Sequence, residues 1–265
     1  MVLTELIRDI PSVSIEGDAS RDIRTIEYDS RKVVSGSLFM AIRGRKTDGN
    51  IFISDAVTRG AAAVLTDEPA TGAAQAGAIA VVRVPDARKA MALIADRFYS
   101  SPQESLIMTG ITGTNGKTTV SYMVRSIFET AGIGCGLIGT IRHIVGNEII
   151  ESINTTPEAP DIHSFLSRMA RAGQEACVME VSSHALSLSR VHGIRYRAAV
   201  FTNLTRDHLD FHDDFVSYLD AKSLLFSELS GDSTAVINGD DPSAEHIKLS
   251  SSGGRVVTFG FGSGN

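Results

Sequence analysis

Leu106–Thr119, with the sequence LIMTGITGTNGKTT, decides the fold. The apolar residues at its start predict a buried strand. Its glycines and its Lys-Thr pair are followed by apolar residues at helical spacing from Val120 to Phe128. A strand, a glycine-rich loop and a helix form a phosphate-binding loop, because backbone N–H groups and the helix N-terminus then face the phosphates. The stretch therefore predicts an α/β domain that binds a nucleotide.

The loop residues predict particular contacts. Lys117 can reach the outer phosphates, and Thr118 can place its hydroxyl on Mg²⁺. One position departs from the common pattern, because Ile111 stands where a glycine is usual, five residues before Gly116. A glycine-rich turn that binds nothing is the alternative. The residues assigned to ATP are Gly113, Thr114, Asn115, Gly116, Lys117, Thr118 and Thr119.

Composition bounds the class of protein. The chain has 265 residues, of which 43% are hydrophobic and 21% charged, as in a globular protein of about two domains. A net charge of −6 argues against general nucleic-acid binding. No apolar run is long enough to span a membrane, and the N-terminus does not resemble a signal peptide. With Cys135 and Cys177 expected to be buried reduced thiols, we expect a cytoplasmic monomer.

Two domains are expected. Strand and helix patterns alternate through residues 1–101 and predict an α/β unit, and Ser100-Ser101-Pro102 is a plausible hinge. Residues 102–265 predict a mostly parallel sheet with crossover helices, and the segment before Asn154 is expected to be a polar loop. Such sheets bind ligands at the carboxyl ends of their strands.

Three further clusters follow expected strands. Glu180 ends the apolar run ACVME, so it is either a metal or charge-binding group or a surface carboxylate. The stretch TNLTRDHLDFH contains His208 and His212, which either bind metal or are solvated. The stretch Asn238–Pro242 reads as a type I turn.

The motifs GTNGKTT, NTTP, EVSSHAL, TNLTRDHLDFH, YLDAKSLLF and NGDD occur in this order. The set closely resembles the Mur ligases, specifically the MurE type (UDP-N-acetylmuramoyl-tripeptide synthetases), over essentially the whole chain. The resemblance implies a UDP-binding α/β domain followed by a P-loop ATPase domain. We expect the C-terminal ligase domain of such enzymes to be absent from this length of chain, which is then a fragment or a shortened relative.

The same resemblance implies an activity. Mur ligases of this type join a diamino acid to UDP-N-acetylmuramoyl-L-alanyl-D-glutamate, using ATP and an acyl phosphate, in peptidoglycan precursor synthesis. Meso-diaminopimelate is expected on family frequency only, because the motif that separates it from L-lysine would lie beyond Asn265.

The resemblance also assigns roles around the phosphates. Thr118 and Glu180 would hold one Mg²⁺, and Glu180, His208 and a carbamylated Lys222 a second. Lys117, Glu180, His208 and Lys222 would be the catalytic residues, whereas His212 would be structural. Asn238 would face the adenine, with Asp240 or Asp241 nearby.

Substrate contacts come from both domains. By resemblance, Tyr28 and Ser30 would contact the uridine end, and Arg45, Lys46 and Thr47 would lie beside the diphosphate. Arg190 offers a fixed fork for a carboxylate or phosphate. Ser182 and Thr156 can also act as caps. The residues expected at the muramyl-dipeptide are Asn154, Thr155, Thr156, Ser182 and Arg190.

Other interpretations stay open. The chain could belong to another ligase of the superfamily, such as a folylpolyglutamate synthase, although the resemblance of residues 1–101 counts against this. It could also be a non-catalytic module that binds a UDP-sugar or a nucleotide. Locally, Lys222 reads as a surface lysine that snorkels beside an apolar helix face.

Overall fold

The computed structural model describes residues 1–44, 47–69, 79–205, 211–212 and 214–262. Arg45, Lys46 and His208 lie outside these residues. The chain divides into two compact units, Met1–Ser100 and Ser101–Asn265, and each is described by itself.

The first unit is a five-stranded sheet in the order β1-β5-β4-β3-β2. Strands β2 to β5 are parallel, and β1 runs antiparallel to β5. The strands are β1 (Ser14–Glu16), β2 (Thr25–Glu27), β3 (Ser37–Met40), β4 (Ala63–Thr66) and β5 (Ala80–Arg83). The helices are α1 (Leu3–Leu6), α2 (Ile53–Thr58) and α3 (Ala87–Phe98), with short 3₁₀ turns η1 (Ser30–Lys32) and η2 (Gly49–Phe52).

Strand alternation divides this unit into two apolar cores. Leu38 and Met40 of β3 pack with α1 and α3, whereas Phe39 between them packs with Ile53 of α2. Successive side chains of a strand point to opposite faces, so both faces of the sheet are covered by helices. Asp86, which the sequence places at a helix start, accepts hydrogen bonds from the first-turn amides of α3.

The second unit contains an eight-stranded sheet in the order β13-β12-β11-β6-β10-β7-β8-β9. Its strands are β6 (Ile107–Thr112), β7 (Cys135–Ile138), β8 (Arg142–Val145), β9 (Glu148–Glu151), β10 (Ala176–Glu180), β11 (Ala198–Phe201), β12 (Thr234–Asn238) and β13 (Arg255–Phe259). Its helices are η4 (Pro102–Ser105), α4 (Lys117–Thr130), α5 (Ala159–Arg171), α6 (Ser183–Ser187), α7 (Phe215–Ser227) and α8 (Ala244–Ser250). All pairs except β7–β8 and β8–β9 are parallel.

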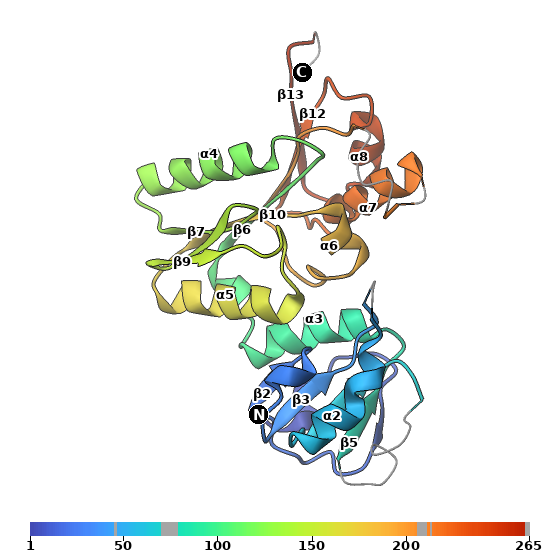
Figure 1. The fold of residues 1–265 in the computed structure, drawn as a ribbon. Helices are drawn as coiled ribbons and strands as arrows, with labels where there is room; N and C mark the ends of the chain where they lie inside the picture. Colours follow the sequence, from blue (N-terminus) through green and yellow to red (C-terminus); the bar gives the residue numbers. More distant parts are fainter. Residues whose placement is uncertain (45–46, 70–78, 206–210, 213, 263–265) are drawn as a thin grey trace. The chain divides into compact units, whose positions relative to one another are not determined.

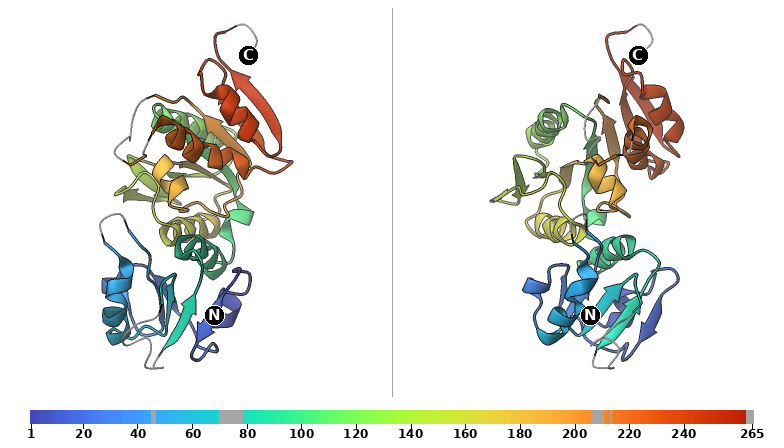
Figure 2. Two further views of the ribbon diagram at one scale, coloured as in Figure 1. Left: turned by 90° about the vertical axis from the view of Figure 1, so that its right-hand side faces the viewer. Right: turned by 45° about the vertical axis from the view of Figure 1, so that its right-hand side comes forward.

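Helix α4 covers one face of this sheet and α5 covers the other (Figure 1). Val178 of β10 belongs to the core under α4, whereas Cys177 and Met179 belong to the larger core on the opposite face. Helix α8 packs beside β12 in that second layer (Figure 2). The predicted α/β fold with a mostly parallel sheet is confirmed.

Two elements differ from the sequence-based expectation. The segment expected to be a polar loop before Asn154 forms the hairpin β8–β9, whose strands pair Val145 with Glu148. A two-residue turn, Gly146-Asn147, joins them, and Gly146 has a φ of 60°. Such turns favour glycine at the first position because it needs a positive φ. Helix α8 was also not expected, since its short amphipathic run follows the Asn238–Pro242 turn directly.

Both cysteines are buried free thiols, as predicted. Burial raises the pKa of Cys135 to about 11 and raises that of Cys177 well above its ordinary value. Both shifts favour the protonated thiol over the nucleophilic thiolate. Among the residues described, no helix has the length and apolar character needed to cross a membrane.

Candidate functional site

The phosphate-binding loop lies at the topological switch point of the sheet, where the order of the strands reverses. After β6 the chain passes through α4 to β7, on the side of β10, whereas β11 pairs with the other edge of β6. Crevices at such switch points, beyond the carboxyl ends of the strands, are where open α/β sheets bind ligands.

The loop is held by the residues that follow β11. The Thr114 N–H donates to the Asn203 carbonyl at 2.8 Å, and the Asn115 N–H donates to Asn203 Oδ1 at 2.9 Å. The Thr202 hydroxyl donates to the Asn115 carbonyl at 2.7 Å. Lys117 Nζ folds back over the loop and donates to the carbonyls of Gly113 and Thr114, both at 2.9 Å. These hydrogen bonds hold the loop in a defined shape, with the Lys117 amine bound to the loop's own carbonyls.

Close packing explains both the glycine at 113 and the isoleucine at 111. A Cβ on Gly113 would lie 1.9 Å from Thr202 Oγ1 and 3.0 Å from the Asn203 carbonyl, and its φ is 145°. Ile111 instead lies within β6, and its side chain is fully buried in the core under α4. The glycine usual at position 111 is therefore not needed here, because the close contact with Thr202 and Asn203 is made two residues later, at Gly113.

We predict that Gly113→Ala disables the loop. The added methyl group would collide with Thr202, and alanine is strained at this φ. Destabilisation of about 2–4 kcal/mol is expected from such overpacking and strain. Thermal unfolding and ATP binding of the variant measure it. Gly132→Ala serves as the comparison, since it has a φ of 79° but nothing within 4 Å of its added Cβ. Equal effects of the two changes would contradict the role of close packing.

Glu180 is a fully buried carboxylate at the end of β10. It shares the strand face of Val178, beneath α4, and it accepts a hydrogen bond from the Thr118 hydroxyl at 2.8 Å. Thr140, which follows β7, donates its hydroxyl at 2.9 Å and its N–H at 3.0 Å. A Cβ on Gly139 would lie 2.3 Å from Glu180 Oε1, so a larger residue there would displace the carboxylate.

These oxygen atoms fit a hard cation. Mg²⁺ is usually bound by one or two carboxylates together with phosphate and water oxygens. The Glu180 carboxylate and the Thr118 hydroxyl bring such ligands together at the edge of the phosphate-binding loop. Within the part of the chain that the structure describes, no three His, Cys, Asp or Glu side chains form a metal cluster.

The NTTP segment lies against this carboxylate. The Thr155 and Thr140 hydroxyls are 3.0 Å apart, and the Thr156 hydroxyl donates to the Glu180 carbonyl at 2.8 Å. Ser182 caps α6 by accepting from the Ala185 N–H, so its predicted capping role is present. The Asn154 side chain is exposed.

Lys222 is buried, with 1% of its surface exposed. Its Nζ donates to the Gly113 carbonyl at 3.1 Å and lies 4.4 Å from the centre of the Tyr218 ring. The Tyr218 hydroxyl in turn lies 3.1 Å from Thr114 Oγ1. The local reading of Lys222 as a surface lysine is therefore wrong. It and Lys117 converge on the same carbonyl of the phosphate-binding loop.

The turn after β12 ties β11 to the chain's last described residues. Asn238 Nδ2 donates to the Thr202 carbonyl at 2.8 Å, and Asp241 accepts from the Leu204 N–H at 2.7 Å. Asp240 accepts from the N–H groups of Phe261 and Gly262. His212 is 5% exposed and packs its ring 5.0 Å from the Tyr218 ring centre, which fits a structural role.

In the first unit, polar residues lie together at the carboxyl ends of β2, β3 and β4. The Ser30 hydroxyl bonds to Asp55, and this bond is the largest cause that lowers the pKa of Asp55. Tyr28 is half-buried against the core of α1 and α3. Thr47 is exposed, and its carbonyl accepts from the Gly44 N–H at 2.9 Å.

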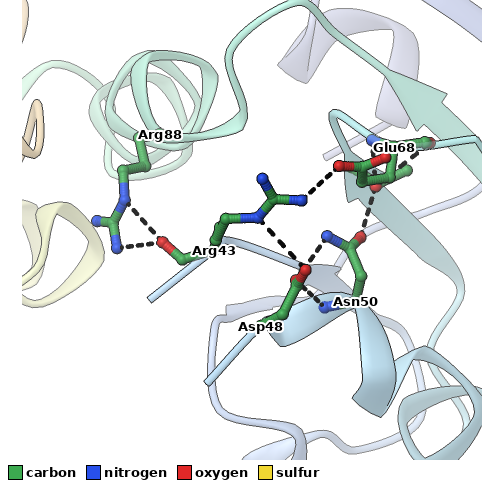
Figure 3. A network of polar contacts seen from close by, with 6 residues as sticks. Arg43, Asp48, Asn50, Glu68 and Arg88 are labelled. Carbon is green, nitrogen blue, oxygen red and sulfur yellow. Dashed lines mark hydrogen bonds and ion pairs between the residues drawn. The ribbon is translucent and has the colours of Figure 1, made fainter. Parts of the chain in front are cut away.

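A network of polar contacts joins Arg43, Asp48, Asn50, Glu68 and Arg88 (Figure 3). Arg43 donates to Glu68 at 2.6 Å and lies 3.4 Å from Asp48, whose other oxygen accepts from the Asn50 N–H and Nδ2. The Asn50 N–H bond is the largest cause that lowers the pKa of Asp48. Arg88 Nη2 of α3 donates to the Arg43 carbonyl at 2.8 Å. Both ends of the segment between Arg43 and Asp48 are therefore fixed.

Sequence reasoning missed three residues that hold the site. Thr140 contacts Glu180 twice, Asn203 orders the loop, and Tyr218 touches both Thr114 and Lys222. The available signal was position, because Thr140 and Asn203 stand at the carboxyl ends of the segments expected to be strands.

Two family models match the chain. One, the Mur ligase family catalytic domain, matches residues 22–99, and the other, the Mur ligase middle domain, matches residues 111–265, which is more than half of the chain. The first match covers the part that a folylpolyglutamate synthase was expected to lack.

Curated relatives are similar over most of this chain. The UDP-N-acetylmuramoyl-L-alanyl-D-glutamate–2,6-diaminopimelate ligase of Clostridium perfringens is 41% identical over 247 residues, 93% of this chain and 50% of that protein. The protein of the same name from Chlorobaculum tepidum is 47% identical over 87% of this chain and 45% of its own length. The chain thus spans about half the length of the curated relatives it matches.

A solved structure has a similar fold. The structure of a UDP-N-acetylmuramoyl-L-alanyl-D-glutamate–2,6-diaminopimelate ligase superposes with a TM-score of 0.80 at 27% identity, covering 97% of this chain and 52% of that one. The family models, the relatives and this structure agree along the chain, and on their evidence the chain belongs to the Mur ligase family.

Proposed function

We propose that the chain forms the nucleotide-binding and UDP-substrate-binding part of an ATP-dependent ligase. This ligase adds a diamino acid, meso-diaminopimelate in the named relatives, to UDP-N-acetylmuramoyl-L-alanyl-D-glutamate. The observation that carries the proposal is the hydrogen bond from the Thr118 hydroxyl to the buried Glu180 carboxylate at 2.8 Å. It joins the phosphate-binding loop to the strand that leads into the proposed substrate-binding residues.

The chemistry needs two steps. A carboxylate is a poor electrophile, so its oxygen first attacks the γ-phosphorus of ATP and releases ADP, which gives an acyl phosphate. The amine then attacks the acyl carbon, loses a proton and expels phosphate, leaving the amide. Phosphoryl transfer depends mainly on positioning and on cations around the transferring group.

The residues of the chain divide this work. Lys117 and the first N–H groups of α4 bind the phosphates, while Asn203 and Thr202 keep the loop in shape. Asn238 lies at the end of β12 and is proposed to face the adenine. When bound, Mg²⁺ would neutralise charge on the phosphate oxygens. Thr118 and Glu180 would hold one ion, and Glu180, His208 and a carbamylated Lys222 would hold a second.

The UDP-substrate is proposed to contact both units. Tyr28, Ser30 and the segment 45–47 would bind its UDP end. The residues that would bind its muramyl-dipeptide end are Asn154, Thr155, Thr156, Ser182 and Arg190. Among them, the Thr156 hydroxyl donates to the Glu180 carbonyl and accepts from the Ser182 N–H. The buried free thiols fit a reducing compartment, so we propose the cytoplasm, with the protein acting as a monomer.

We predict that residues 1–265 bind the UDP-substrate without forming the amide. The relatives are about twice as long, and the amino-acid site is proposed to lie in the part that this chain does not match. Calorimetric titration with UDP-N-acetylmuramoyl-L-alanyl-D-glutamate should show binding. Incubation with ATP, Mg²⁺ and either diamino acid should give no tripeptide by mass spectrometry. Detectable product would overturn this division of labour, and absence of binding would overturn the proposed substrate.

A further inference from the structure

The Arg190 guanidinium is held from two sides by one turn. Its Nη1 donates to the Thr156 carbonyl at 2.8 Å, and its Nη2 forms an ion pair with Glu158 Oε1 at 2.8 Å. Only 16% of the Arg190 side chain and 13% of the Glu158 side chain are exposed. An ion pair removed from water to this extent has a defined geometry, unlike the loose pairs of a surface.

The backbone of Arg190 is fixed as well. Helix α6 ends in a Schellman arrangement, in which the Ser189 N–H donates to the Leu186 carbonyl and the Arg190 N–H donates to the Ala185 carbonyl at 2.9 Å. Ser189 has a φ of 54°, a left-handed conformation that glycine adopts more easily than serine. The helix end thus fixes the backbone from which the arginine side chain extends.

One edge of the guanidinium remains available. Arg190 Nε is buried and has no hydrogen-bond partner among the residues that the structure describes. Buried donors are nearly always satisfied in proteins, so an orphaned one indicates a ligand or solvent partner. Arginine presents its donors as a planar fork that suits a carboxylate or a phosphate.

We propose that Glu158 is a positioning residue that sets the direction in which Arg190 meets an anionic group of the UDP-substrate. Its carboxylate pairs with Nη2, which leaves the Nε–H as the donor for the ligand. The inference rests on the substrate-binding role of Arg190 proposed above. In this role Glu158 acts through Arg190 and does not contact the substrate.

Two other roles for Glu158 lead to different results. If its charge merely weakened the attraction of Arg190 for an anion, removing that charge would tighten binding. If the pair were only structural, its loss would lower stability and weaken all ligands alike. The Glu158 side chain does not cap α5, so its removal leaves the start of that helix intact.

The test titrates the 265-residue chain and its variants with UDP-N-acetylmuramoyl-L-alanyl-D-glutamate and, separately, with ATP and Mg²⁺. Glu158→Ala should weaken binding of the UDP-substrate about tenfold, because a misdirected group loses its contact with the ligand. Affinity for ATP should not change. Glu158→Gln keeps an oxygen for Nη2, so its UDP-substrate affinity should return close to that of the original chain. Glu148→Ala is the matched control, since it removes an exposed glutamate–arginine pair between β9 and α5.

The outcomes separate the two proposals. If Arg190→Ala leaves UDP-substrate affinity unchanged, the substrate role of Arg190 is wrong. If Arg190→Ala weakens binding but Glu158→Ala does not, Arg190 binds substrate without needing Glu158, and only the positioning role fails. Tighter binding by both Glu158 variants, or equal losses for ATP and the UDP-substrate without recovery in Glu158→Gln, would also overturn it.

Discussion

Lys117→Ala should abolish ATP turnover by the full-length ligase that carries this sequence, while leaving the fold intact. The change removes a cation that can move from the carbonyls of Gly113 and Thr114 to the phosphates. Loss of one group that stabilises transition-state charge costs roughly a hundredfold to a thousandfold in rate. ADP release in the presence of both substrates measures the effect.

The fold should tolerate this change because Lys117 belongs to no apolar core. Loss of each of its two hydrogen bonds lowers the free energy of unfolding by about 1–3 kcal/mol, which is less than the stability of an ordinary domain. Circular dichroism and thermal unfolding check this point. Lys248→Ala is the matched control, since Lys248 lies on α8 in an ion pair with Glu245. Normal turnover by a folded Lys117→Ala protein would rule out the assignment of the loop.

Much of the fold follows from local patterns in the sequence. Met108 and Ile111 lie on opposite faces of β6, as alternation requires. In β10, Glu180 lies two residues after Val178 and therefore on the same face, under α4. The sequence could also place ligand-binding residues after strands, because parallel strands bring their carboxyl ends to one edge. These features depend on periods of two or 3.6 residues, which a single sequence displays.

Contacts between distant segments could not be predicted in this way. Thr140 and Glu180 meet because β7 pairs with β10, and that pairing has no local signature. The Arg190–Glu158 pair depends on the end of α6 and on the turn before α5 together. Only the resemblance to a family pointed to Arg190, and nothing pointed to Glu158.

Lys222 shows a signal that local reasoning overlooked. Tyr218, Lys222, Leu225 and Phe226 recur at the spacing of one helix face, and Tyr218, Leu225 and Phe226 belong to the core. A lysine in the middle of such an apolar face is itself expected to be buried, whereas a snorkelling lysine lies at the border of the face and keeps its amine in water. Its burial supports a specific role, because an amine removed from water needs compensating partners.

The last prediction concerns that role. We expect Lys222 to react with CO₂, so that its neutral amine becomes a carbamate with release of a proton. A free ammonium would be repelled by Mg²⁺, whereas a carbamate supplies the oxygen atoms that this cation prefers. Intact-mass measurement and ¹³C NMR after incubation with labelled bicarbonate should detect one CO₂ on Lys222. Lys248, which is paired with Glu245 on α8, should carry no such label at equilibrium.

Substitution at this position should then remove most of the ligase activity. Lys222→Ala opens space in the core at the Gly113 carbonyl, so a small carboxylic acid added to the assay should enter and restore part of the rate. Lys222→Met keeps most of the side-chain volume and should fold well, but it should stay inactive with or without the acid. The contrast between the two variants separates loss of the anion from loss of packing. Wild-type activity in Lys222→Ala would show that no carbamate is needed, and the second group of Mg²⁺ ligands would then have to be sought elsewhere in the chain.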